Sequence, residues 1–279
     1  NAWAFQILVN TSDHDKHLSF AHAFKLTVSG FAFSYTTPFG SGGAPYRVME
    51  LSRYIGTPRA VSSVALYSMM HVFSHFFLWS TALIAFVIAH FDVMNAWLWS
   101  LFAGYVTVFV AAGAFFSYSY KHGIARVFRL LFFVPFLRRP ARRFYERHLE
   151  AFDTIDANIR FLYEHPRQLW GSLAAEYVGR LLNSFEFYFI LLAFGIPGAN
   201  FVDGLIILGF SSLMGNLLFF LPMQIGAREG SLAVIVPLLF PGVGQAIGIY
   251  VSFYTRIREI FWIVVGVLLV KIGNKQLMR

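Results

Sequence analysis

The residues with the clearest chemical potential lie in one short segment, 221–230. It contains the helix breaker Pro222, two glycines and the adjacent charged residues Arg228 and Glu229, and an apolar run flanks it on each side. Charged side chains at membrane depth are costly and usually mark the path of a substrate or ion. Backbone freed by Pro222 and Gly226 is tolerated there only where protein buries it or where it lines a wet cavity. The alternative interpretation is a cytoplasmic loop that joins two helices.

The composition is that of a polytopic helical membrane protein. Of the 279 residues, 57% are hydrophobic, 19% are aromatic and only 13% are charged, whereas a soluble domain has about 25% charged residues. The apolar runs are continuous, as in membrane helices. We therefore predict an all-α polytopic membrane protein with about six to eight membrane helices, including re-entrant or broken half-helices, and with a two-repeat architecture as one option.

Several kinds of site are excluded or disfavoured. The chain has no cysteine, which excludes disulfides, zinc–cysteine sites and thiol nucleophiles. The sequence contains neither a glycine-rich phosphate loop with a lysine nor a G-x-S-x-G turn. His71 and His75 share a helix face, as metal ligands can, but buried hydrogen-bonding histidines are commoner. We expect no cofactor, no metal and no catalytic residue.

The net charge of +8 follows from basic residues in the loops between apolar runs. Membrane orientation and anionic headgroups explain this excess more simply than a nucleic-acid partner does. Lysine and arginine are concentrated in 47–59, 121–167 and 271–279, whereas the loops near Asp92, Pro197 and Pro241 contain none. We therefore predict a multi-pass protein of the cell (inner or cytoplasmic) membrane. The positive-inside rule places its basic loop and its C-terminus on the cytoplasmic side.

The apolar runs also predict the order of elements along the chain. Membrane spans are expected at 61–89, 96–118, 169–194, 204–221 and 246–270, a marginal one at 18–35, a helix tail at 2–9 and a half-helix or re-entrant segment at 231–240. The prolines and glycines of 37–47 exclude a continuous helix, and 48–59 has the composition of an interfacial helix.

The basic middle of the chain is expected to contain no membrane span. An interfacial amphipathic helix is predicted at 124–136 and a short cytoplasmic helix at 152–167, which ends near Pro166. The basic residues there either recruit anionic lipid or only set the topology. We predict one integral membrane domain, 1–279, with a first half at 1–118, a basic cytoplasmic linker at 119–168 and a second half at 169–279.

Charged residues also interrupt the spans of the second half. Glu176 and Arg180 are four residues apart, so they share a helix face and can pair. Arg256, Arg258 and Glu259 lie in the middle of the last span. Arg228 and Glu229 are adjacent and do not face each other in a helix. We therefore favour pairing across helices, with Arg256 and Glu259 as the partners.

Two broken segments, one in each half, resemble each other. In both, a glycine stands four residues after a proline, at 38–42 and at 222–226. The residues that follow are Gly43, Arg47 and Glu50 in the first segment and Ala227, Arg228 and Glu229 in the second. Paired interruptions by glycine and proline in two halves of a chain point to the binding site of a transporter.

These motifs resemble those of the membrane domain of the lysylphosphatidylglycerol synthases (multiple peptide resistance factors), which stand-alone flippase-like proteins share. The matching residues are Pro222, Gly226 and Glu229 with the neighbour Arg228, and Pro38, Gly42, Gly43 and Arg47. Ala44 stands where the family often has an acidic residue. The resemblance covers nearly the whole chain in helix order, and we expect that two preceding hydrophobic helices are missing.

The resemblance implies a flippase fold with re-entrant helices around a cavity. It implies movement of aminoacylated phosphatidylglycerol or another polar lipid between leaflets, without the soluble aminoacyl transferase domain of the long family members. The implied partners are a membrane phospholipid, anionic or aminoacylated, and a lipid-modifying synthase or glycosyltransferase. A homo-oligomer is an open option.

Our functional prediction is a lipid translocase with a charged intramembrane cavity. The substrate-binding candidates are Arg228, Glu229, Arg256, Arg258, Glu259, Arg47, Glu50, Gln224, Glu176 and Arg180, and the structural candidates are Pro38, Gly42, Gly43, Pro222 and Gly226. Arginines hold phosphates well, and glutamates neutralise them or meet an amino group. One alternative is an integral-membrane transferase with Glu229 or Glu176 as general base. Another is a non-transporting partner of a lipid synthase.

Overall fold

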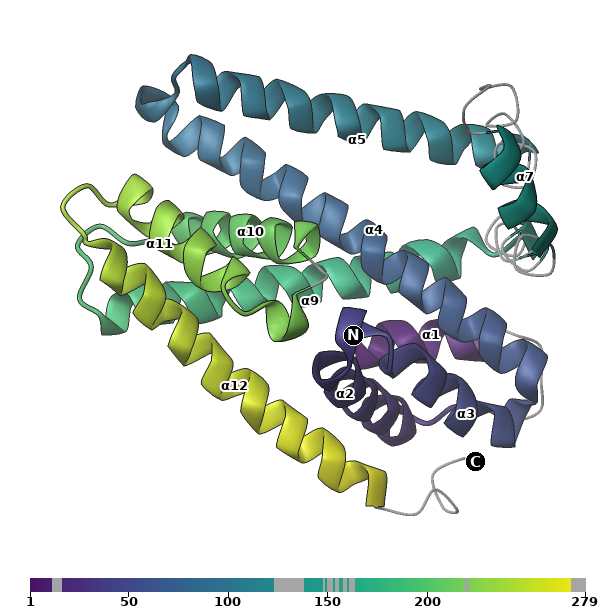
Figure 1. The fold of residues 1–279 in the computed structure, drawn as a ribbon. Helices are drawn as coiled ribbons and strands as arrows, with labels where there is room; N and C mark the ends of the chain where they lie inside the picture. Colours follow the sequence, from purple (N-terminus) through teal and green to yellow (C-terminus); the bar gives the residue numbers. More distant parts are fainter. Residues whose placement is uncertain are drawn as a thin grey trace. The chain divides into compact units, whose positions relative to one another are not determined.

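The computed structural model describes residues 1–11, 17–122, 138–147, 149, 153, 156–157, 160, 164–218 and 221–271. All regular elements in these ranges are helical, which confirms the all-α fold class (Figure 1). The helices are α1 Ala2–Thr11, α2 Phe20–Thr36, α3 Gly43–Ile55, α4 Thr57–Ala89, α5 Ala96–His122, α7 Arg138–Arg147, α9 Pro166–Ala193, α10 Phe201–Leu217, α11 Ala227–Leu239 and α12 Gln245–Lys271. Short 3-10 turns lie at η1 Pro38–Gly40, η2 Phe91–Val93 and η4 Pro222–Gln224.

The chain divides into two compact units. One unit contains Asn1–Met94 and Trp170–Arg279, and the other contains Asn95–Leu169. The second unit holds α5 and α7, while the first holds both broken segments and the charged parts of α9 and α12. The functional question therefore concerns the first unit. The predicted division into halves at 1–118 and 169–279 stays a prediction.

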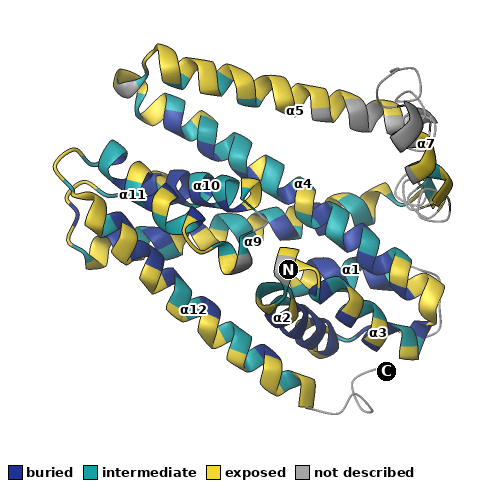
Figure 2. Ribbon diagram, in the orientation of Figure 1, coloured by how far each residue is buried: buried dark blue, intermediate teal, exposed yellow. Residues whose placement is uncertain are grey.

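Membrane character is clearest in α4. Among the described residues, it is the one helix that is both long and apolar enough to cross a bilayer by composition alone, while Ala96–Ala111 and Phe201–Leu217 are apolar but shorter. The predicted span at 246–270 corresponds to α12, whose middle carries three charged residues. A large part of the α12 surface is nonetheless apolar and exposed (Figure 2), including Phe253, Ile257 and Phe261. This helix combines a charged stripe with an apolar face.

The two predicted helix breaks are present, and each contains a 3-10 turn whose middle residue has a positive φ. After α2, Thr37 is extended, as expected for a residue before proline, and Phe39 has a φ of 58°. After α10, Met223 has a φ of 53° in η4, and Gly226 has a φ of 85° just before α11. The two breaks contact each other. Left-handed non-glycine residues cost about 1–3 kcal/mol each and cluster at functional sites.

Three element boundaries differ from the prediction. The helix expected at 48–59 begins earlier, because α3 starts at Gly43 and takes Pro45 into its first turn, where a missing N–H breaks no hydrogen bond. It ends at Ile55, and α4 begins at Thr57 rather than at residue 61. Pro166 begins α9. The interfacial helix predicted at 124–136 lies outside the described residues, as does half of 152–167.

The half-helix expected at 231–240 is present as α11. It has 13 residues, which give a length of about 20 Å, against the roughly 30 Å of a bilayer core. Its first turn contains Glu229, whose carboxylate accepts a hydrogen bond of 2.8 Å from the Gly226 N–H. This cap satisfies a backbone donor that the break at η4 leaves free. Glu229 therefore stabilises the start of its own helix.

Glycines bring several helices of the first unit close together. A Cβ on Gly209 in α10 would overlap Ala82 of α4, and a Cβ on Gly248 in α12 would overlap the Leu232 carbonyl oxygen in α11. A Cβ on Gly266 in α12 would lie 2.6 Å from the Val28 carbonyl oxygen of α2. Small residues at such contacts are the usual means by which membrane helices pack. The glycines thus fix the helices that surround the charged residues.

The glycine contacts give a first prediction. Gly248→Ala should lower the free energy of unfolding by about 1–3 kcal/mol, because its methyl group meets a backbone atom that cannot move aside. Gly230→Ala is the matched control, since nothing lies within 4 Å of a Cβ there. Thermal unfolding of the purified protein in detergent measures both variants. Equal melting temperatures for the two would contradict the packing described above.

Candidate functional site

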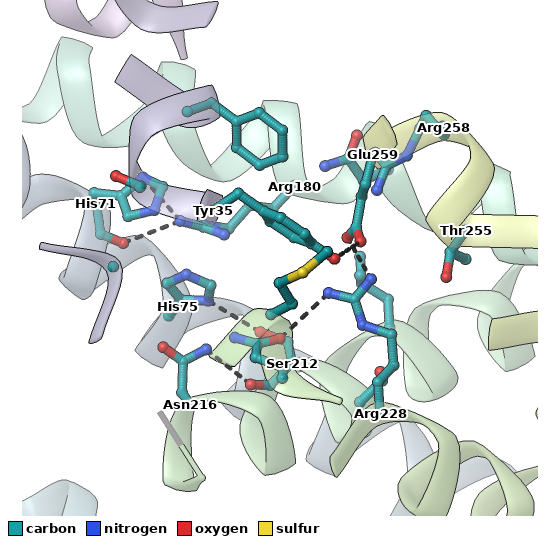
Figure 3. Close-up of a pocket in the computed structure, with 18 of the residues that line it drawn as sticks. Tyr35, His71, His75, Arg180, Ser212, Asn216, Arg228, Thr255, Arg258 and Glu259 are labelled. Carbon is teal, nitrogen blue, oxygen red and sulfur yellow. Dashed lines mark hydrogen bonds and ion pairs between the residues drawn. The ribbon is translucent and has the colours of Figure 1, made fainter. Parts of the chain in front are cut away.

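A polar cavity of about 410 Å³ lies within the first unit (Figure 3). The breaks η1 and η4 and the helices α2, α4, α9, α10, α11 and α12 contribute residues to its wall. Its polar lining residues are Ser34, Tyr35, Thr37, His71, His75, Arg180, Asn183, Ser211, Ser212, Asn216, Gln224, Arg228, Thr255, Arg258 and Glu259. The cavity therefore joins residues from both ends of the chain.

One side of the cavity is charged. Arg228 of α11 donates through Nη1 to the Glu259 carboxylate of α12, and through Nη2 to the Gln224 side-chain oxygen at 3.3 Å. The Tyr35 hydroxyl of α2 donates to the same Glu259 carboxylate. Figure 3 shows this group of side chains meeting at one point of the wall. The pairing between helices that the sequence favours is thus present in the structure.

A second ion pair supports this wall from behind. Arg256 approaches Glu229 Oε1 with Nε at 2.6 Å and Nη2 at 2.5 Å, and the Ser252 hydroxyl donates to the same oxygen at 3.2 Å. Arg256 Nη1 also donates to the Met223 carbonyl oxygen at 3.3 Å and to the Tyr35 hydroxyl at 3.2 Å. These contacts attach the break η4 to α12. Neither member of the pair lines the cavity itself.

A third arginine of the charged side, Arg258, pairs with Glu186 of α9 at 2.9 Å. The charged residues predicted for the site did not include Glu186, although it lies in the same apolar run as Glu176 and Arg180. This ion pair joins α12 to α9. Glu186 is a member of the site that the sequence prediction missed.

The other side of the cavity is held by a buried carboxylate. Glu176 is 0% exposed, and its Oε2 lies 2.9 Å from His71 Nδ1 and 3.7 Å from Arg180 Nη2. Arg180 also donates to the Ser74 hydroxyl at 2.6 Å and to the His71 carbonyl oxygen at 3.1 Å. The predicted pair of Glu176 and Arg180 is present, with His71 as the nearer partner of the carboxylate. The same His71 Nδ1 lies 3.2 Å from Arg180 Nη2, so the carboxylate and the guanidinium both meet this ring nitrogen.

A neutral network continues this side along α4 and α10. His75 Nδ1 lies 3.0 Å from the Ser212 hydroxyl, which also accepts a hydrogen bond of 3.1 Å from Trp79 Nε1. Asn216 donates to the Ser212 carbonyl oxygen at 2.8 Å, one turn along α10. His71 and His75 therefore use their Nδ1 atoms in hydrogen bonds to the protein.

The predicted substrate-binding residues fall into three groups, of which the third, Arg47 and Glu50, is described separately below. Those that line the cavity are Gln224, Arg228, Arg258, Glu259 and Arg180, and those in the ion pairs behind its wall are Glu229, Arg256 and Glu176. The structural candidates Pro38, Gly42, Gly43, Pro222 and Gly226 lie at the two breaks. Gly42 and Gly43 have no room for a side chain. A Cβ on Gly42 would meet the Thr37 side chain, and a Cβ on Gly43 would meet the Ser34 side chain.

Arg47 and Glu50 form the third group, and they do not line the cavity as expected. Arg47 donates to the carbonyl oxygens of Leu26 and Thr27 at 3.4 Å each, and its guanidinium lies 5.2 Å from the Tyr67 ring centre. Glu50 is buried and pairs with Arg53 at 3.1 Å. The early start of α3 and the absence of a side chain at Gly30 bring Arg47 against α2 instead.

Sequence reasoning missed the uncharged part of the site. Tyr35, Asn183, Ser212 and Asn216 all line the cavity. The available signal was spacing, since Ser212 and Asn216 are four residues apart in an apolar run, as are His71 and His75. Residues four apart share a helix face. Polar residues at that spacing on two apolar segments therefore indicated two facing polar stripes.

The buried carboxylate gives a second prediction. Glu176→Gln keeps the side-chain shape but removes the charge opposite Arg180, so the free energy of unfolding should fall by about 3 kcal/mol. Glu146→Gln is the matched control, because Glu146 pairs with Arg142 at an exposed position and such pairs contribute about 0–1 kcal/mol. Thermal unfolding in detergent compares the two. A shift no larger for Glu176→Gln than for the control would contradict the assigned role.

Comparison with known families agrees with the all-α membrane fold. Residues 1–267 match the family model of the lysylphosphatidylglycerol synthase TM region. The comparisons with curated proteins and with solved structures returned no match. The match to the family model covers most of the chain, and it supports a location in the membrane and a function related to membrane lipids. The chain belongs to the family of the lysylphosphatidylglycerol synthase transmembrane region.

Proposed function

We propose that this chain is a lipid translocase that moves a polar phospholipid headgroup between the two leaflets. The observation that carries the proposal is the cavity in which Arg228 and Glu259 meet between a broken helix and α12. Family membership supports a lipid-related function. The exposed apolar face of α12 supports a path on which acyl chains remain in the surrounding lipid.

Arg228 is the proposed phosphate ligand. In the structure its guanidinium is neutralised by Glu259 and also reaches Gln224. A guanidinium binds phosphate oxygens in the same planar, two-pronged way as it binds a carboxylate. A lipid phosphate can therefore replace Glu259 as the partner of Arg228 without leaving the arginine unpaired. The Tyr35 hydroxyl donates to Glu259 and would therefore remain a partner of this carboxylate after the phosphate binds Arg228.

The break before α11 supplies a second attraction for a phosphate. The first N–H groups of a helix have no partner within the helix and carry partial positive charge. Glu229 accepts from the Gly226 N–H, and Arg228 lies in the first turn of α11. Helix starts of this kind are favourable for anions. The broken helix therefore supports phosphate binding next to Arg228.

A translocation assay tests the proposal and gives the third prediction. Arg228→Gln combined with Glu259→Gln removes the ion pair without leaving a buried charge alone. Transfer of an acyl-labelled phospholipid in proteoliposomes should slow by at least about tenfold, since charge-assisted hydrogen bonds are lost. The measurement is the loss of fluorescence after a reductant is added that reaches the outer leaflet only.

The control for that assay is Arg142→Gln combined with Glu146→Gln. This pair has the same chemistry but is exposed on α7, in the other unit. Its transfer rate should equal that of the wild type. A wild-type protein that moves lipids no faster than protein-free vesicles, across anionic, zwitterionic and aminoacylated lipids, would refute the translocase proposal.

We further propose that the basic segments face the cytoplasm, on the basis of the charge distribution in the sequence. The absence of cysteine allows single cysteines to be introduced without background labelling. As a fourth prediction, Asp92→Cys should react with a membrane-impermeant maleimide added to intact cells, and Arg147→Cys should react only after permeabilisation. The opposite pattern would reverse the orientation while leaving the cavity unchanged.

A further inference from the structure

The charged residues around the cavity balance one another in the part of the chain that the structure describes. The arginines at or behind the wall and the glutamates that pair with them are, in order, Arg180 with Glu176, Arg228 with Glu259, Arg256 with Glu229 and Arg258 with Glu186. Each arginine thus has its own carboxylate. Because uncompensated charge at membrane depth is costly, an anion that enters this cavity alone disturbs the balance.

Glu259 is the carboxylate that a ligand in the cavity reaches. Of the acidic residues that the structure describes, it is the one that lines the cavity, together with its partner Arg228. Glu229 and Glu186 hold their arginines from behind the wall, and Glu176 is fully buried. A ligand can therefore separate Arg228 from Glu259 while the other ion pairs stay intact.

The surroundings of Glu259 offer few substitutes for Arg228. Glu259 is only 5% exposed, and its other partner among the described residues is the Tyr35 hydroxyl of α2, which donates to it. On α12 itself, Arg256 and Arg258 are each engaged with another glutamate. Once a phosphate takes Arg228, Glu259 is a buried carboxylate that keeps one hydroxyl group and has lost its cation.

The other titratable groups near the cavity limit where a compensating charge can go. Glu229 of α11 and Glu186 of α9 are acidic neighbours, and His71 and His75 of α4 lie across the cavity from Glu259 (Figure 3). An isolated buried charge is so costly that the group takes up a proton instead. Glu259 and the two imidazoles can accept such a proton, and Glu259 is the one among them whose cation leaves when the phosphate binds.

We infer that an anionic lipid headgroup and a proton occupy this cavity together, and that Glu259 is the proton site. The inference rests on the proposed translocase function and deepens it. When the phosphate takes Arg228, one proton from the aqueous phase adds to a carboxylate oxygen of Glu259. When the phosphate leaves, the carboxyl group releases this proton and pairs with Arg228 again. The headgroup and the proton then cross the membrane without net charge, whereas a headgroup with its own ammonium group needs no proton.

Two gradients across the same vesicles distinguish a lipid that crosses with a proton from a lipid that crosses alone. The full chain is placed in phosphatidylcholine vesicles with a trace of acyl-labelled phosphatidylglycerol. In one arm the proton concentration differs about tenfold between the two sides, and valinomycin with equal potassium keeps the potential at zero. In the other arm the pH is equal, and a potassium gradient with valinomycin sets about 60 mV, which corresponds to a tenfold ratio for one charge. A reductant that reaches only the outer leaflet measures the distribution at equilibrium.

The wild type should respond to the first gradient and not to the second. The pH gradient should enrich the labelled lipid about tenfold in the leaflet that faces the alkaline side, because the product of lipid and proton concentrations becomes equal on both sides. The potential should cause no enrichment, since lipid and proton together carry no charge. These ratios do not depend on the orientation or the speed of the protein. Protein-free vesicles give the background of each gradient.

Glu259→Gln connects the proton to this side chain. The amide keeps the shape and can still accept from Tyr35, but it does not titrate. The variant should lose the response to the pH gradient, and the same potential should now enrich the lipid about tenfold in the leaflet on the positive side. Glu146→Gln, at an exposed position of α7, is the matched control and should behave as the wild type. The comparison of the two gradients in the wild type tests the coupling even where Glu259→Gln does not fold.

The outcomes separate the inference from the proposed function. Enrichment of the lipid by the potential and not by the pH gradient in the wild type would overturn the inference and retain the translocase. A pH response that persists in Glu259→Gln but is lost in His75→Gln would also overturn it, because the proton would then reside on the histidine. Transfer of other lipids without phosphatidylglycerol would have the same meaning. No transfer of any lipid by the wild type would overturn the translocase proposal and the inference together.

Discussion

The ion pair between Arg256 and Glu229 is the interaction on which the rest of this site depends. Glu229 also accepts a hydrogen bond from the backbone at Gly226, and Arg256 also donates to the Met223 carbonyl oxygen. One pair of side chains therefore fixes the helix break, the start of α11 and the position of α12. A charge left alone in such surroundings costs several kcal/mol, so the break and the pair require each other. The wall of the cavity follows from this constraint.

The arginines of the site divide into those that support it and those that can change partner. Arg256 and Arg180 have several partners within the protein and hold helices together. Arg228 lines the cavity and has its carboxylate partner there too. Glu259 neutralises Arg228 in the structure, and in the proposed translocase a lipid phosphate would take the place of this carboxylate. In the proposed translocase, Arg256 and Arg180 therefore hold the helices of the site together, and Arg228 binds the lipid phosphate.

Much of this organisation could be predicted from the sequence, because charges in apolar runs have few partners to choose from. The two breaks follow from Pro38 and Pro222, and pairing across helices follows from the adjacency of Arg228 and Glu229. The position of Arg47 could not be predicted, since it depends on the space beside Gly30 in another helix. The spacing of Ser212 and Asn216 indicates a polar helix face. That this face meets the histidines of α4 could not be predicted, because it depends on how α4 and α10 pack together.

The close glycine contacts have a consequence for motion. Gly266 joins α12 to α2 and Gly248 joins α12 to α11, whereas Gly209 joins α10 to α4 and Gly204 joins α10 to α9. These contacts divide the helices around the cavity into two groups, with α2, α11 and α12 on the arginine side and α4, α9 and α10 on the histidine side. Between the two groups, α10 packs against α11, and the ion pair of Arg258 with Glu186 joins α12 to α9. Movement of one group against the other would therefore have to change both the Arg258–Glu186 ion pair and the packing of α10 on α11.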